Sequence, residues 1–232
     1  MAWRTNSGTA NSGTGTTVTV TQSGIQLNDI VLLVGMCGGS GTLTPTSPGF
    51  SAAPSLSNVN VNGATFYALW KLAGASEPGS YVVTPGDTDY FTCQLVAASG
   101  RNTGSPFTAV ASTGVQGPTT LPTTYAANAV TAALGDDVLV FYGVEGANSS
   151  DTLTFGTPSG FSNTLDTANN ATFNPSQFTA YMANVAAGST GTISSSVSDT
   201  GSKSLHWAAY TISLAAASGA PASYFLGNDN YF

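Results

Sequence analysis

The two halves of this chain repeat each other's order of apolar segments and turns. Three pairs of segments correspond: 29–35 with 137–143, 48–51 with 158–162, and 66–73 with 178–186. The first pair shares an Asp followed by an apolar run and a Gly, and the second shares a Pro-containing turn before Phe-Ser. The separations of 108, 111 and 112 residues differ by no more than short loop insertions would add. The pattern predicts a duplicated unit, which restricts the fold to one that two similar copies can build together.

Short apolar or alternating runs bounded by Gly, Pro, Asn and Asp fill both halves, a pattern typical of β-sandwiches and barrels. Val18 and Val20 alternate with threonines, so we expect both to face a core. No segment longer than a few residues has helical periodicity, so the chain is expected to be all-β. The expected strands are 16–21, 29–37, 65–72, 80–84 and 90–97 in the first half, and 128–134, 138–144, 178–186, 192–197 and 205–214 in the second.

These strands predict a jelly-roll-like sandwich of about ten strands with internal pseudo-twofold symmetry, in which each half forms one of two sheets around a shared core. The expected divisions are an N-terminal arm 1–15, a duplicated sandwich 16–217 with halves of about 16–100 and 125–217, and an aromatic C-terminal tail 218–232. Residues 101–124, rich in Gly, Pro, Ser and Thr, are expected to form a surface crossover that tucks in Phe107, Val110 and Val115.

Charged residues are scarce, at 6% of the chain against about 25% in an ordinary soluble domain. The net charge is −7 and the four basic residues are scattered singly, which argues against a nucleic-acid partner. The longest apolar run, 30–37, is far shorter than the roughly 20 residues of a membrane-spanning helix. The first residues lack the basic and apolar regions of a secretory signal, so we expect no membrane association and no signal-directed export.

The two cysteines, Cys37 and Cys93, fall in expected core strands. A disulfide between them is one possibility, but two buried thiols that act as small apolar side chains is the favoured interpretation. Two short acidic pairs occur, Asp87 with Asp89 and Asp136 with Asp137. Asp87 and Asp89 are weak candidates for a calcium site, although neither pair matches an EF-hand spacing and turn-forming Asp is the default. We expect no metal and no cofactor.

Lys71 and Glu77 are the sharpest charged pair, one at the end of an expected strand and one in the following turn. We expect them to stabilise the turn, in preference to forming a ligand clamp. The single histidine, His206, lies within an expected strand and is not expected to act as a catalytic base.

Aromatic residues gather near both chain ends. We expect these residues to make assembly contacts: Trp3, Tyr224, Phe225, Tyr231 and Phe232. Tyr125, Phe155 and Phe173 are candidates for a sugar-binding platform if they lie on the surface, although the sequence does not distinguish them from core residues.

The segment 69–81 reads Leu-Trp-Lys-Leu-Ala-Gly-Ala-Ser-Glu-Pro-Gly-Ser-Tyr and resembles a recurrent segment of phage virion proteins and bacterial surface proteins. The flanking Pro-Gly-aromatic turn at 48–50 and the Gly-Asp-apolar strand at 135–140 extend the likeness over most of residues 25–217. Its specific part is the dozen residues around Lys71 and Glu77. The resemblance implies a jelly-roll-like sandwich of tail appendages and head decorations, with no catalytic residues.

Together these features predict a non-enzymatic structural protein of a phage-like virion. The first expectation is a capsid decoration or cement protein that binds other virion proteins and copies of itself through its termini. The alternative is a carbohydrate- or receptor-binding tail appendage that reads a host glycan.

Overall fold

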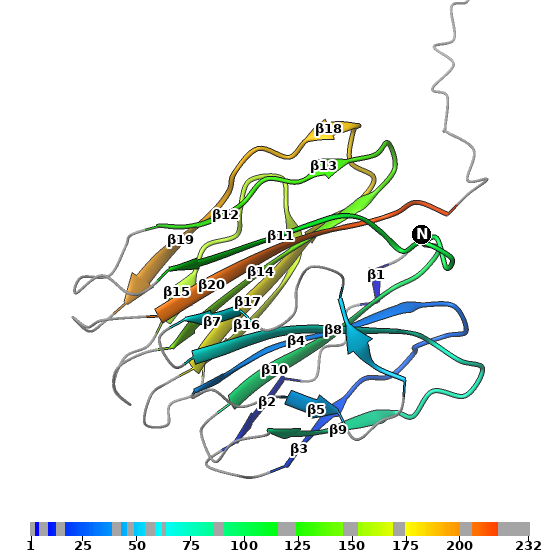
Figure 1. Cartoon of the computed structure of the whole chain (residues 1–232), viewed down its shortest axis with the longest axis horizontal. Helices are drawn as coiled ribbons and strands as arrows, with labels where there is room; N and C mark the ends of the chain where they lie inside the picture. Colours follow the sequence, from blue (N-terminus) through cyan, green and yellow to red (C-terminus); the bar gives the residue numbers. More distant parts are fainter. Residues whose placement is uncertain are drawn as a thin grey trace, which may run out of the picture.

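A computed structural model shows an all-β protein in which every strand pair is antiparallel (Figure 1). The structure describes residues 3–4, 9–12, 17–38, 43–45, 49–53, 59–61, 64–85, 91–115, 124–145, 153–168, 175–199 and 206–217. None of these residues is helical, in agreement with the expected fold class.

The first half contributes a large and a small sheet. The large sheet has the order β1-β10-β4-β8-β6, with β2 also on β10 and β7 also on β8; the small sheet has the order β3-β9-β5. The strands are β1 (Trp3–Arg4), β2 (Thr9–Ser12), β3 (Val18–Thr21), β4 (Ile30–Gly38), β5 (Leu43–Pro45), β6 (Ser51–Ala52), β7 (Val59–Val61), β8 (Ala64–Leu72), β9 (Ser80–Pro85) and β10 (Phe91–Ala98).

The second half has the same division. Its large sheet has the order β11-β20-β14-β17-β16, and its smaller sheets are β12-β19-β15 and the pair β13-β18. The strands are β11 (Phe107–Val115), β12 (Thr124–Ala127), β13 (Thr131–Ala132), β14 (Asp137–Glu145), β15 (Leu153–Phe155), β16 (Ser162–Ala168), β17 (Pro175–Met182), β18 (Gly188–Ser189), β19 (Ile193–Asp199) and β20 (His206–Leu214).

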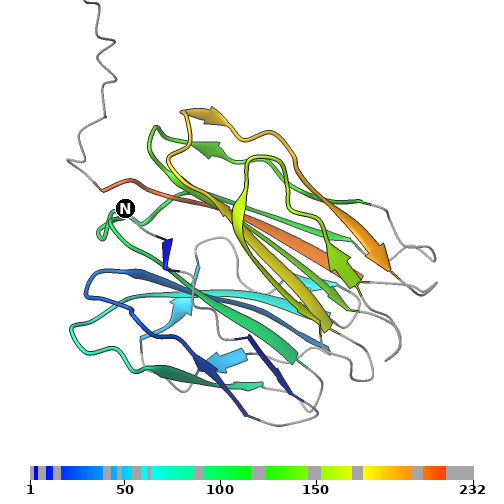
Figure 2. The same cartoon turned by 180° about the vertical axis from the view of Figure 1, so that it is seen from behind.

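The sheets stack in four layers, with the two large sheets facing each other in the middle (Figures 1 and 2). A central core lies between the large sheets and takes residues from both halves, among them Leu32, Phe66, Phe141 and Tyr210. A first outer core lies between β4-β8-β10 and β3-β9, and a second lies between β14-β17-β20 and β12-β19-β15. The central strands β4 and β14 are apolar on both faces because each face is buried in a core.

The shared core between two facing sheets agrees with the expected sandwich, but each half supplies an additional outer layer. The strand count therefore exceeds the expected ten, since short strands such as β5, β15 and β18 belong to these outer layers. The structure corrects the expectation that residues 101–124 form a surface crossover. They contain the nine-residue strand β11, which forms an edge of the second large sheet. Its Gly, Ser and Thr content suggested a loop, whereas Phe107 and Val110 pack against the central core.

The strand bounds in the second half also differ from expectation. The expected strand 128–134 is largely turn and yields the two-residue β13, while β12 begins earlier, at Thr124. β17 begins before the expected 178 and ends at Met182, because Asn184 adopts a left-handed conformation with φ 51° that breaks the extended chain. Within the expected arm 1–15, β1 and β2 pair with β10 along the first large sheet.

Four strands of each large sheet correspond in order, β10-β4-β8-β6 with β20-β14-β17-β16, although two of the sequence alignments are one residue out of register. Ile30 is the first residue of β4 and pairs with Leu72, the last residue of β8. Asp137 is the first residue of β14 and corresponds to Ile30. Leu32 and Leu139 both face the central core, a separation of 107 residues and not 108. A one-residue shift would turn every side chain to the other face of the sheet, so burial settles the register.

The same reasoning gives 111 residues for β8 against β17, one fewer than expected from the sequence. Trp70 and Tyr181 pack against the central core, and their edge partners Ser51 and Ser162 are also 111 apart. The matching positions around Phe50 and Phe161 therefore agree with the sequence alignment.

Candidate functional site

The segment 69–81 forms a corner between the large and small sheets of the first half. It leaves β8 at Leu72 and enters β9 at Ser80. Glu77 lies in the corner with its side chain 5% exposed, and its Oε2 accepts hydrogen bonds from Lys71 Nζ at 2.9 Å and from the Tyr81 hydroxyl at 2.7 Å. Its Oε1 accepts a third from the Gly74 N–H at 2.7 Å. One carboxylate therefore ties the end of β8, the turn and the start of β9.

Aromatic rings flank the ammonium of this corner. Lys71 Nζ lies 5.6 Å from the ring centroid of Phe50 and 5.8 Å from that of Tyr81, within cation–π range. The two rings meet edge to face, with centroids 5.8 Å apart. Phe50 and the Lys71–Glu77 pair are thus parts of one cluster.

Neighbouring residues of the segment anchor the corner to the rest of the first half. Ala73 is buried, donates its N–H to the Asp29 carbonyl at 2.8 Å and accepts from the Asn28 N–H at 3.0 Å. Trp70 packs edge to face on Phe107 in the central core, with centroids 5.1 Å apart. Six residues of the segment therefore have a packing or hydrogen-bonding role: Trp70, Lys71, Ala73, Gly74, Glu77 and Tyr81.

Opposing effects act on the pKa of Glu77. Burial raises it, but the hydrogen bonds from Tyr81, Gly74 and Lys71 together outweigh burial and bring the pKa below the ordinary value of 4.5. Burial and the neighbouring Glu77 carboxylate raise the pKa of the Tyr81 hydroxyl, which stays a donor at neutral pH. The corner consequently holds a charged pair in a nearly closed setting.

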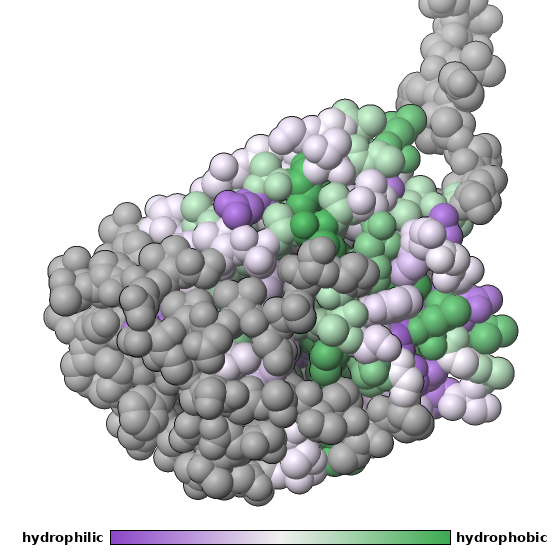
Figure 3. All heavy atoms as spheres, viewed as in Figure 1, coloured by the Kyte–Doolittle hydropathy of each residue, from purple (hydrophilic) through white to green (hydrophobic). Residues whose placement is uncertain are grey.

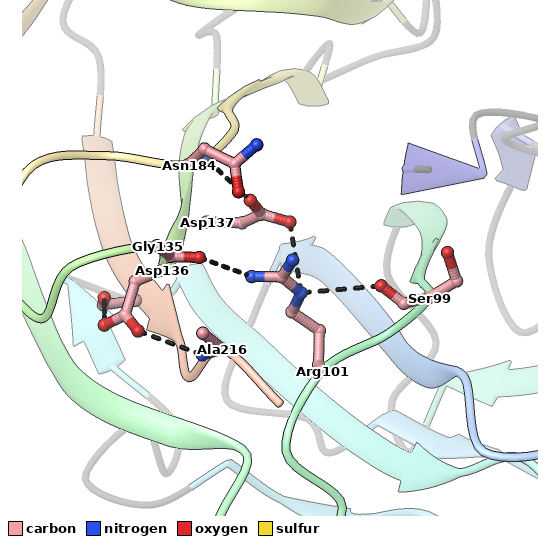
Figure 4. Close-up of polar contacts among 8 residues, drawn as sticks. Ser99, Arg101, Gly135, Asp136, Asp137, Asn184 and Ala216 are labelled. Carbon is pink, nitrogen blue, oxygen red and sulfur yellow. Dashed lines mark hydrogen bonds and ion pairs between the residues drawn. The ribbon is translucent and has the colours of Figure 1, made fainter. Parts of the chain in front are cut away.

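A second polar cluster joins the two halves, and Figure 4 shows its contacts. Arg101, fully buried just after β10, donates from Nη1 to the Gly135 carbonyl at 3.0 Å. Its Nε lies 3.4 Å from Asp137 Oδ2 and 3.5 Å from the Ser99 carbonyl. Asp137 Oδ1 accepts from the Asn184 N–H at 2.9 Å. A cation from the first half thereby meets the first carboxylate of β14 in the second.

Asp136 ties the end of β20 to the turn before β14. Its Oδ2 accepts from Ser213 Oγ at 2.8 Å and from the Ala133 N–H at 2.9 Å, and its Oδ1 accepts from the Ala216 N–H at 3.1 Å. Asp29 has the matching place in the first half, where its Oδ2 accepts from the Gln26 N–H at 2.8 Å. Each of these two carboxylates therefore accepts the backbone N–H of the residue three positions earlier and forms part of a turn.

Burial is the main influence on Asp137 and raises its pKa, and the nearby Asp136 adds to this. The Asn184 N–H and the Arg101 guanidinium act in the opposite direction without overcoming burial. The two carboxylates thus have pKa shifts in opposite directions: the pKa of Glu77 is lowered and that of Asp137 is raised.

A third cluster lies between the two large sheets. The Thr179 hydroxyl donates to Gln94 Oε1, and Gln94 Nε2 donates to the carbonyls of Leu165 and Gln177 at 3.4 and 3.5 Å. When the Gln177 amide is oriented so that both of its polar atoms have partners, its oxygen accepts from the Gln94 N–H at 2.8 Å. These buried amides connect β10 with β16 and β17 inside an otherwise apolar core, which restricts how one sheet can slide on the other.

The structure also shows where other candidate residues lie. Tyr125 and Phe155 are 0% and 6% exposed and stack within the second outer core, so they do not form a surface sugar platform. Cys37 and Cys93 are buried thiols not joined by a disulfide. His206 is half-buried at the start of β20. Trp3 belongs to β1, opposite Ala98. The remaining candidates lie outside the described residues: Asp87, Asp89, Phe173, Tyr224, Phe225, Tyr231 and Phe232.

Sequence reasoning did not identify the Arg101–Asp137 contact or the role of Gln94. Arg101 looked like one of several scattered cations, and a contact between residues 36 positions apart in sequence leaves no local spacing signal. The available clue was that a charged residue directly follows a strand expected to be core. Gln94 carried a similar clue, because it interrupts an apolar strand.

Among the residues that the structure describes, no three His, Cys, Asp or Glu side chains gather in the manner of a metal site. The described part of the chain likewise has no helix of membrane-spanning length and hydropathy. Comparison of the chain with protein-family models, with curated proteins and with solved structures found no match.

Proposed function

We propose that this protein is a non-enzymatic structural component of a phage-like virion, and that its first role is capsid decoration or cementing. In this role the molecule is a rigid block that buries apolar and aromatic area against other virion proteins and copies of itself. We also propose that the protein is related to the phage virion and bacterial surface proteins that segment 69–81 resembles, and that it is located in the virion.

The observation that carries the proposal is the use to which the described charged side chains are put. Lys71 and Glu77 close a corner between sheets, while Arg101, Asp136 and Asp137 hold the turns where the two halves meet. Stiff corners on a four-layer stack of apolar cores favour shape and mechanical strength over chemistry at a cleft.

The proposal includes an origin for the architecture, namely duplication of a jelly-roll-type unit. In its support, the order β10-β4-β8-β6 in the first large sheet parallels β20-β14-β17-β16 in the second. The small sheets β3-β9-β5 and β12-β19-β15 also correspond in order. In both halves the chain passes several times between the large sheet and the small one, since β3, β5 and β9 of the first half and β12, β15 and β19 of the second fall between strands of the large sheet, as in a jelly roll.

Attachment through the termini is supported by where the described chain ends lie. Trp3 pairs with Ala98 at the end of β10, and Ala216 bridges to Arg101 three residues further along. Figure 1 shows the N-terminus and the last described segment at the same end of the stack. A single end of the block can therefore present both termini to one larger surface.

The test uses virion particles stripped of this protein. The full chain should bind them saturably, and deletion of 218–232 should abolish binding while the variant keeps its folded circular-dichroism spectrum. A matched control, Ser194→Ala with Ser198→Ala on the exposed face of β19, should bind normally. Failure of the full chain to bind particles, together with saturable retention on host polysaccharide, would overturn the decoration role in favour of the glycan-binding alternative.

A further inference from the structure

The large apolar side chains that remain exposed in the described structure gather at one end of the molecule. They are Leu27, Leu72 and Leu134, with exposed fractions of 58%, 38% and 66%. Isolated exposed leucines need no explanation, but these three are all the large hydrophobic side chains found exposed among the described residues. Their shared location therefore needs one.

Backbone contacts place these leucines at a common end. Leu27 lies in the turn before β4, where the next residue, Asn28, bonds to Ala73 beside Leu72. Leu134 lies in the turn before β14, and Gly135 in that turn accepts a hydrogen bond from Arg101 at the end of the first half. Figure 3 shows hydrophobic residues interspersed with hydrophilic ones at this end, around the turns between β3 and β4 and between β8 and β9. We call the three side chains the leucine end.

The described chain finishes at the leucine end. Ala216 donates its N–H to Asp136, two residues after Leu134, and its Cβ would lie 3.5 Å from a Cβ added at Gly135. Residues 218–232 follow and contain Tyr224, Phe225, Leu226, Tyr231 and Phe232. Tyr224 is seven positions after Ala217, a stretch that can span up to about 23 Å, so these side chains can reach the leucine end from their point of origin.

We propose that residues 218–232 of the same chain dock on the leucine end. A segment that starts beside its binding surface meets it at an effective concentration in the millimolar range, which favours the same chain over a second copy. Neutral aromatic side chains match a surface that offers leucines and backbone turns rather than charge. The consequence of docking rests on the proposed function. Docking holds the attachment segment on the isolated subunit, and a virion surface that competes for the segment can release it.

The consequence can be separated from the docking itself, since docking is a property of the isolated full chain. The aromatic and leucine residues of 218–232 are chymotrypsin sites, and proteolysis of a segment that opens and closes rapidly follows the population of its open form. The measurement is the rate of cleavage within 218–232, followed by mass spectrometry, at several protein concentrations.

The key variant is Leu27→Ser, Leu72→Ser and Leu134→Ser together, and the matched control is the same three residues changed to Met, which keeps the apolar area. The serine variant should be cleaved about tenfold faster than the natural chain, whereas the methionine variant should match the natural chain. All three rates should be independent of protein concentration, and equal unfolding midpoints should show that the fold is unaffected.

Equal cleavage rates in the natural chain and the serine variant would overturn the docking surface. Protection that disappears on dilution, together with dimers in sedimentation, would overturn docking within one chain in favour of a second copy. Particle binding reports separately on the proposed function: a chain with a docked segment that fails to bind stripped particles contradicts the virion role and leaves the docking intact.

Discussion

The corners that follow β8 and β17 have the same backbone arrangement but different polar side chains. In the first half Ala73 exchanges backbone hydrogen bonds with Asn28 and Asp29, and in the second Val185 does the same with Gly135 and Asp136. The first corner is closed by Glu77, Lys71 and Tyr81, all within ten residues of one another. The second is held by Asp137 and by Arg101, which comes from the other half.

This difference shows that two corners with the same backbone arrangement can be held by different charged contacts. The counterpart of Asp137 in the first half is Ile30, a central-core residue, and the counterpart of Lys71 in the second is Met182. The first half closes its corner locally, whereas the second depends on the first for its cation. The two corners can therefore be perturbed independently, with different expected consequences.

The largest effect should come from removing the cation that joins the halves. Arg101→Met leaves Asp137 buried without its positive partner, which should lower the free energy of unfolding by about 3–5 kcal/mol. Urea denaturation followed by tryptophan fluorescence measures this loss. A loss below about 1 kcal/mol would mean that the contact between the halves does not depend on the pair.

The control for that variant replaces Asp137 with the apolar residue that the first half has at the corresponding position. Adding Asp137→Ile to Arg101→Met gives the second half the apolar residue that Ile30 provides in the first, so the double variant should recover much of the lost stability. If the double variant is less stable than Arg101→Met alone, the correspondence between Ile30 and Asp137 is wrong.

The local corner should be somewhat less sensitive. Glu77→Ala removes the acceptor of three hydrogen bonds, and we expect a loss of about 2–3 kcal/mol in the free energy of unfolding. Lys71→Met introduces the residue found at the equivalent place in β17 and leaves Glu77 two donors, so its cost should be near 1 kcal/mol. Equal costs for both variants would contradict the central position of the carboxylate.

A smaller loss is expected where the two large sheets interlock. A Cβ added at Gly143 would lie 2.7 Å from the Phe66 ring of the facing sheet, so Gly143→Ala should cost about 1–3 kcal/mol through overpacking. Phe66→Leu alone should also destabilise, but combining it with Gly143→Ala should cost less than the sum of the two. Additive losses in thermal melts would show that the two residues do not share the space.

The all-β class and the position of most long strands could be predicted because their signals are local. The runs around Leu32 and Val140 are apolar on both faces, and Gly, Pro and Asp mark their ends. β11 could not be predicted from its Ala, Ser, Thr and Gly content, since its strand conformation depends on pairing with β20, almost a hundred residues later. Local composition does not record such a partner.

The charged clusters also differ in whether the sequence could predict them. Lys71 and Glu77 are six residues apart, so a turn between them made their contact foreseeable. Arg101 and Asp137 meet because two sheets stack, and the stacking depends on the whole fold. Register was lost for a related reason: similar letters at 29–35 and 137–143 align best at 108, while the face that each side chain occupies requires 107.

The smallest predicted effect is a difference in pH dependence between the two carboxylates. The pKa of Asp137 is raised in the folded state, so the folded protein binds more protons than the unfolded chain between about 3.8 and that raised value. Its contribution to stability therefore increases as the pH falls through this window. The pKa of Glu77 is lowered from 4.5, so its contribution is present above 4.5 and is lost as the pH falls through the folded value. Subtracting the unfolding free energies of Asp137→Asn and of Glu77→Gln from that of the natural chain, between pH 3 and 7, should give curves of opposite slope. Curves of the same slope would mean that burial and hydrogen bonding do not divide the two corners as their geometry indicates, because the sign of each slope depends on which of these two influences is stronger at that carboxylate.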